Sequence, residues 1–88
     1  MNDTWRQLAL AARRGNAEAE QLLAPFIDQL RHHPQQLAVQ AETLAGLLAQ
    51  EEQDLLIWLL DPGKAPAHWQ ALLTQIRRCY QQRLNSQQ

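Results

Sequence analysis

The stretch from Leu10 to Glu20, LAARRGNAEAE, brings two arginines, one glycine and two glutamates into eight consecutive positions. Guanidinium and carboxylate groups beside a glycine can form directional, charge-assisted hydrogen bonds, and a residue without a side chain lets another backbone come close. The same residues suit the junction of two helices, because bases favour a helix end, glycine a turn and acids a helix start. The residues alone therefore leave two interpretations open, a plain turn or a surface for another protein.

Residues that could perform covalent or metal chemistry are sparse. The only serine is Ser86, near the end of the chain, and the only cysteine is Cys79, beside an apolar stripe, where we expect it to fill the core. His32 and His33 are adjacent, so on a helix they would point about 100° apart and could not hold one metal ion together. His68 has no acid near it, and the three glycines lie too far apart to form a phosphate loop. We predict no catalytic, metal-binding or cofactor-binding residues and a protein that is not an enzyme.

Composition bounds the fold and the partners. The 88 residues suit one small domain, 1–88, and 45 % are hydrophobic but only 6 % aromatic, with Leu and Ala prominent, which favours packed helices without strands. A formal charge of −1 gives no overall attraction to nucleic acid or to an anionic membrane surface. A lone cysteine excludes an internal disulfide and suits a reducing compartment, and no apolar run is long enough to span a bilayer. We expect a cytoplasmic protein that inserts in no membrane and binds no nucleic acid.

The spacing of apolar residues predicts five helices. The first, capped by Asp3 or Thr4, runs to about Arg14, and Asn16 can cap a second that runs to about Arg31. Pro25 lies inside the second helix, where it must bend or interrupt it, and we favour a bend. The polar segment RHHPQQ reads as a connection. A third helix then ends near Gln50.

The second half of the chain is punctuated by DPGKAP, which predicts a turn at residues 61–63. Before it, EEQDLLIWLL suits a short helix buried on most sides, with its acids at the positive end of the helix dipole. After it comes the most regular apolar stripe of the chain, formed by Trp69, Leu72, Leu73, Ile76, Tyr80 and Leu84. We expect Trp58 and Trp69 to anchor the core, and Trp5 to close an edge or stand partly exposed. The prediction is an all-α, single-domain bundle of about five helices with short loops, with a core over about 4–84 and a frayed tail at 85–88.

The glycine turn also invites comparison with a helix-turn-helix DNA-binding motif. The helix that would enter the groove opens with Glu18 and Glu20 and contains Asp28. These carboxylates would lie where phosphates approach, so the charges argue against DNA binding.

Beyond the turn itself, an ordered set of motifs carries a resemblance. The set comprises Arg14, Gly15 and Glu18 in the pattern Arg-Gly-x-x-Glu with Arg13 before it, the pair Pro25-Phe26, the pair Leu47-Leu48, the stretch Asp54-Leu55 to Trp58-Leu59, and Gly63-Lys64. Over about residues 9–80 the chain resembles the bacterial FAD assembly factor family, the SdhE type, which is related to the mitochondrial succinate dehydrogenase assembly factor 2. The family usually has a bulky apolar residue and an aspartate where this chain has Asn16 and Glu20.

The resemblance implies a small helical factor that acts as a chaperone. Such a factor binds the flavoprotein subunit of succinate dehydrogenase, or of fumarate reductase, and promotes the covalent joining of FAD to a histidine of that subunit. The FAD and the histidine belong to the partner, so this chain would bind no cofactor stably. The residues implied in partner binding are Arg13, Arg14, Gly15 and Glu18, and we expect the free factor to be a monomer.

A different class of function remains as the alternative. Relatives of this family have also been described as antitoxin-like or inhibitory modules that act on a membrane or cytoskeletal partner. Capture of partners from a cell lysate would separate the two, since only the first interpretation expects a flavoprotein subunit.

Overall fold

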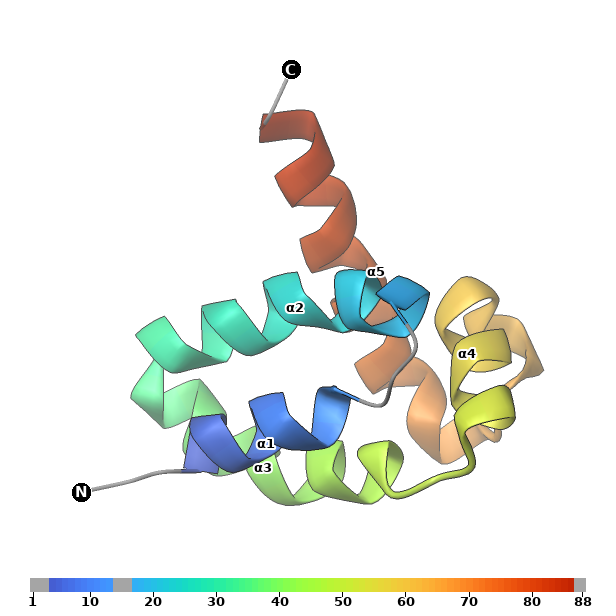
Figure 1. Ribbon diagram of the computed structural model, residues 1–88, viewed down its shortest axis with the longest axis horizontal. Helices are drawn as coiled ribbons and strands as arrows, with labels where there is room; N and C mark the ends of the chain where they lie inside the picture. The colour runs from blue at the N-terminus through green and yellow to red at the C-terminus, as the bar shows by residue number, and fades with distance from the viewer. Residues whose placement is uncertain (1–3, 14–16, 87–88) are drawn as a thin grey trace.

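Helices account for most of the structure, a computed structural model that describes residues 4–13 and 17–86 (Figure 1). Five α-helices and one short 3-10 helix are found there: α1 (Thr4–Ala12), α2 (Ala17–His32), α3 (Pro34–Leu48), α4 (Glu52–Leu60), η1 (Pro62–Lys64) and α5 (Ala67–Ser86). These ranges contain no strand, which confirms the all-α prediction.

The first two helices run antiparallel, with α3 packed against α1 and α5 against α2 (Figure 1). Apolar side chains from all five α-helices meet in one core, and the radius of gyration is 12.2 Å. That value is close to the roughly 12 Å expected for one compact domain of this length. The C-terminal end of α5 projects beyond the other helices, and its residues 81–86 are all exposed.

Helix α2 supplies the centre of the core. Leu23, Phe26 and Leu30 have no exposed surface and recur at the three- and four-residue spacing that keeps side chains on one helix face. Pro25 lies buried within α2, and the helix continues past it to His32. The helix is therefore not interrupted at the proline.

Two predicted irregular segments are more ordered than expected. The connection predicted over RHHPQQ shrinks to His33, because α2 continues through His32 and Pro34 opens α3. Proline fits a first helical position, where its missing N–H is not needed, and it keeps the preceding residue out of the helical conformation. Residues 85–86 belong to α5, where the Ser86 hydroxyl donates to the Gln82 carbonyl at 2.9 Å.

The prediction that α4 is buried on most sides was also wrong. Ile57 and Leu60 are 46 % and 49 % exposed, because they lie on the side of α4 opposite the fully buried Leu55 and Leu59. Leu84 continues the periodicity of α5 yet is 44 % exposed, because it lies on the projecting end of that helix. The tryptophans Trp58 and Trp69 are partly buried and pack against the core, as expected of anchors.

The predicted turn after α4 is confirmed. Residues 62–64 form η1, and the Asp61 carboxylate accepts a hydrogen bond from the Gly63 N–H at 3.2 Å. An aspartate side chain that bonds a backbone N–H two residues on is a standard device for closing such a turn. None of the described helices is both long and apolar enough to cross a membrane.

Candidate functional site

The corner between α1 and α2 contains the charged residues that the sequence singled out. Helix α1 ends at Ala12 and α2 begins at Ala17, so the predicted end near Arg14 falls past the last helical residue. Arg14, Gly15 and Asn16 lie outside the described residues. Arg13 and Glu18 are described, and both are exposed.

Small buried residues hold this corner in place. Ala12 is 4 % exposed and Ala19 is 1 % exposed, and each directly adjoins one of the exposed charged residues, Arg13 or Glu18. A buried alanine fixes the backbone of its neighbour, because its small side chain lets two helices pack closely. Arg13 and Glu18, on the two described sides of the corner, are therefore presented to solvent beside buried residues.

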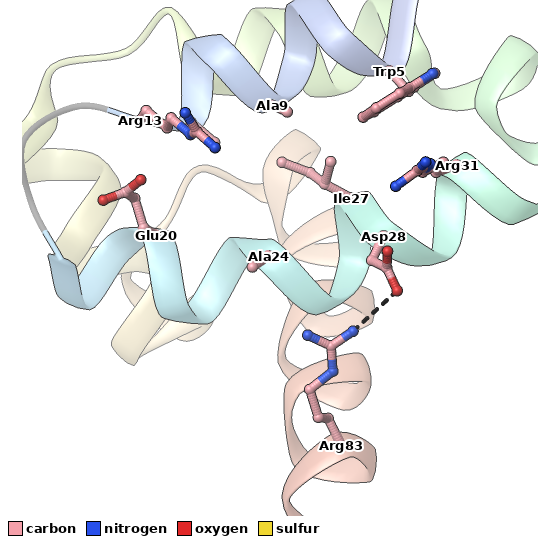
Figure 2. Close-up of a pocket in the computed structure, with 10 residues that line it drawn as sticks. Trp5, Ala9, Arg13, Glu20, Ala24, Ile27, Asp28, Arg31 and Arg83 are labelled. Atoms are coloured by element: carbon pink, nitrogen blue, oxygen red, sulfur yellow. Dashed lines mark hydrogen bonds and ion pairs between the residues drawn. The ribbon is translucent and has the colours of Figure 1, made fainter.

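A groove opens beside this corner, between α1 and α2 and against the side of α5 (Figure 2). We call it the α1/α2 groove, and its volume is about 410 Å³, within the range of about 300 to 1,000 Å³ that is usual for ligand pockets. Its apolar lining consists of Trp5, Ala9, Ala12, Ala24 and Ile27. Its charged lining consists of Arg13, Glu20, Asp28, Arg31 and Arg83.

The two ends of the α1/α2 groove differ in chemistry. At one end Arg13 and Glu20 face each other from the two helices, close to the corner (Figure 2). At the other end the guanidinium of Arg31 lies over the indole of Trp5, 4.5 Å from the ring centroid. Arg6 also approaches this ring, at 5.6 Å.

An ion pair joins α5 to the edge of the groove. The guanidinium of Arg83 lies 3.2 Å from a carboxylate oxygen of Asp28 (Figure 2). His32 lies 3.9 Å from the other carboxylate oxygen. The Arg83 and Asp28 side chains are 43 % and 47 % exposed, so this pair adds at most about 1 kcal/mol to stability. The ion pair nevertheless means that the Asp28 carboxylate already has a cationic partner, Arg83.

Cys79 is half-buried and packs against the core, as expected of a core residue. Its thiol donates to the Gln29 side-chain oxygen at 3.0 Å. Burial raises the pKa of this thiol, and the nearby charges of Arg78 and Arg83 oppose that effect without reversing it. The thiolate that nucleophilic chemistry needs is therefore disfavoured at neutral pH.

The structure brings together residues that the sequence analysis did not combine. Trp5 and Ala9 on α1 and Arg13 just after it are spaced by four residues, and Glu20, Ala24 and Asp28 are spaced in the same way on α2. Residues four apart share a helix face, so the sequence spacing places each of these two sets of residues along one wall of the groove. That these walls face each other required the antiparallel packing of α1 on α2.

Within the described residues, no group of three or more His, Cys, Asp and Glu side chains could hold a metal ion.

A comparison with protein-family models matches residues 6–80 to the Sdh5 family, described as flavinator of succinate dehydrogenase. The chain belongs to this family. The match contains every motif that carried the resemblance, including the pattern from Arg14 to Glu18. Comparisons with curated proteins and with solved structures gave no significant match.

Proposed function

We propose that the chain is an assembly factor that binds the flavoprotein subunit of succinate dehydrogenase, or of fumarate reductase, and promotes its covalent attachment of FAD. The observation that carries the proposal is the family match over residues 6–80. The exposure of Arg13 and Glu18 at the α1/α2 corner supports it, because a partner protein can reach both side chains.

The proposed factor acts by binding and not by catalysis. The FAD and the histidine that receives it belong to the partner, and this chain holds the partner in a conformation in which the attachment can complete. Cys79, the one cysteine of the chain, has a thiol whose pKa is raised by burial, which makes it a poor nucleophile. This property is consistent with a factor that acts by binding.

Contact with the partner is assigned to Arg13, Arg14, Gly15 and Glu18. Charged side chains on a surface stabilise a fold little, by about 0 to 1 kcal/mol per pair. The same groups form stronger, directional hydrogen bonds once a partner excludes water from around them. Arg13 and Glu18 are both exposed, so a partner protein can reach both side chains.

A deletion strain tests the proposal directly. Covalent flavin on the succinate dehydrogenase subunit is read as fluorescence of the denatured protein in a gel. We expect the signal to fall in the deletion strain and to return with the wild-type gene. An unchanged signal would rule out the proposed function, and capture of only a membrane or filament protein from lysate would favour an inhibitory module.

Complementation with point variants then tests the corner. Glu18→Ala should restore the flavin signal poorly, whereas Glu51→Ala, which removes an exposed acid just before α4, should restore it fully. Circular dichroism of both purified variants separates binding from folding. If Glu18→Ala loses helical signal, the residue has a structural role and the assignment to the partner fails.

A further inference from the structure

The α1/α2 groove has features that the corner motif does not explain. Its apolar floor, formed by Ala9, Ala24 and Ile27, is flanked by charged residues at both ends. Trp5 closes the end farthest from the corner and packs against the core with part of its surface exposed. A hydrophobic floor between fixed charges is the usual composition of a specific binding site.

The stacking of Arg31 on Trp5 leaves this arginine ready to bind an anion. The guanidinium carbon of Arg31 lies over the indole ring, 4.5 Å from its centroid, and the five N–H donors of a guanidinium form a rigid, planar fork. Within the part of the chain that the structure describes, Arg31 forms no ion pair with a carboxylate. The contact with the indole thus holds the guanidinium at this end of the groove.

Charges around the groove favour a negatively charged ligand. Among the residues that the structure describes, its lining has three arginines and two carboxylates, which leaves one positive charge in excess. Asp28 is already paired with Arg83, and Glu20 lies at the opposite end from Arg31, facing Arg13 (Figure 2). The positive charge is therefore least compensated at the end formed by Arg31 and Trp5.

We propose that the α1/α2 groove binds an extended acidic segment of the partner protein, with one carboxylate on Arg31 and an apolar side chain on the floor of Ala9, Ala24 and Ile27. The identity of the partner as a flavoprotein rests on the proposed function, but the chemistry of the segment does not. A second carboxylate of the segment reaches Arg13, which continues the binding surface into the α1/α2 corner.

The length of the groove sets the spacing of the two acids. Trp5 and Arg13 are eight positions apart, which corresponds to about 12 Å along a helix. An extended peptide advances about 3.3 Å per residue, so about four residues span this distance. The segment that fits has two acids about four positions apart with an apolar residue between them.

A synthetic peptide of this composition tests the proposal on the purified full chain. The probe is acetyl-Glu-Ala-Leu-Ala-Glu-amide, and the matched control peptide has glutamine at both ends. Titration is followed by nuclear magnetic resonance at the Trp5 indole N–H and the Ile27 amide. We expect saturable shifts of these signals with the acidic peptide, much weaker shifts with the glutamine peptide, and loss of binding as salt is raised.

Variants then locate the binding on the protein. Arg31→Glu should weaken binding at least about tenfold, the effect of losing one charge-assisted contact. Arg78→Glu makes the same charge change at an exposed position of α5 outside the groove lining, and it should leave binding within about twofold. Circular dichroism confirms that both variants fold.

The possible outcomes separate this proposal from the proposed function. Shifts that are absent, that map outside the groove, or that occur equally with the glutamine peptide would overturn the acidic-segment proposal. The deletion strain would still decide the flavinylation role. The opposite result is also informative. If the acidic peptide binds in the groove but covalent flavin is unchanged in the deletion strain, the groove remains a binding site for acidic segments, and its partner is not the flavoprotein.

Discussion

The guanidinium of Arg31 on α2 lies over the indole ring of Trp5 on α1, 4.5 Å from its centroid, and this contact joins the two helices at the end away from their connection. Both residues are accessible to solvent. Cation–π contacts at such sites contribute about 0.5 to 1 kcal/mol, so the contact matters more for the position of the guanidinium than for stability.

Removing the cation should therefore cost little stability. Arg31→Gln is expected to lower the free energy of unfolding by about 0.5 to 1 kcal/mol, measured by urea denaturation followed by circular dichroism. Arg78→Gln serves as the control for the loss of one exposed cation and should change the free energy by less than about 0.5 kcal/mol. A loss above about 2 kcal/mol for Arg31→Gln would show that the stack holds the fold together.

Much of the fold could be predicted from helical periodicity and turn residues. The apolar residues Leu37, Leu44 and Leu47 recur at helical spacing in α3 and are buried, and the turn at residues 61–63 forms where Asp, Pro and Gly occur. These features depend on local sequence alone. Burial of α4 and of Leu84 could not be read from periodicity, because it depends on whether another helix lies against each face.

The candidate site was only partly predictable for the same reason. The charged pattern at the corner was visible as a motif, with Arg13 and Glu18 at exposed positions. Trp5 and Arg31 are 26 positions apart and belong to no shared motif. Only the antiparallel packing of α1 on α2 brings them together, and no local pattern of residues specifies that packing.

A second prediction concerns Arg77, which links α5 to the C-terminal end of α4. Its guanidinium donates to the carbonyl oxygens of Leu59 at 2.9 Å and Leu60 at 3.1 Å, two of the groups that a helix end leaves unpaired. Arg77→Ala should destabilise the protein by about 1 to 3 kcal/mol, since hydrogen bonds from charged groups contribute this much.

Urea denaturation measures this loss, with Arg78→Ala as the neighbouring control. Arg77 lines neither the α1/α2 groove nor the α1/α2 corner, so below the unfolding transition its alanine variant should still bind the acidic peptide. Loss of peptide binding by folded Arg77→Ala protein would contradict that separation.

A third prediction concerns the packing of Trp69 on Gly46 of α3. A Cβ atom added at Gly46 would lie 3.2 Å from the Cη2 atom of Trp69, which is tighter than ordinary contact. In a helix interior, alanine gains about 1 kcal/mol over glycine. Gly46→Ala should therefore change stability by less than about 1 kcal/mol, because propensity offsets crowding.

A larger side chain at the same position has no such compensation. Gly46→Leu should destabilise the protein by about 1 to 3 kcal/mol, as overpacking does, and displace the Trp69 ring. Urea denaturation gives the stability, and the Trp69 indole resonance reports the displacement. Equal stability of the alanine and leucine variants would show that the Trp69 ring can move away from position 46 without loss of stability.

The last prediction is a loss of stability at alkaline pH caused by Cys79. Burial raises the pKa of its thiol above the ordinary value of 9.0, against the opposing charges of Arg78 and Arg83. As pH rises past 9.0, the unfolded chain loses the thiol proton while the folded chain keeps it, so the unfolded state binds fewer protons. The free energy of unfolding therefore falls with rising pH from about 9 up to the folded-state pKa, and this contribution is fully present below pH 9.

Cys79→Ser retains a donor for Gln29 but does not titrate in this range, so its stability should fall less steeply than that of the wild type between pH 8 and pH 10.5 in urea denaturation. Identical pH profiles for the two proteins would show that the thiol titrates alike in the folded and unfolded chains.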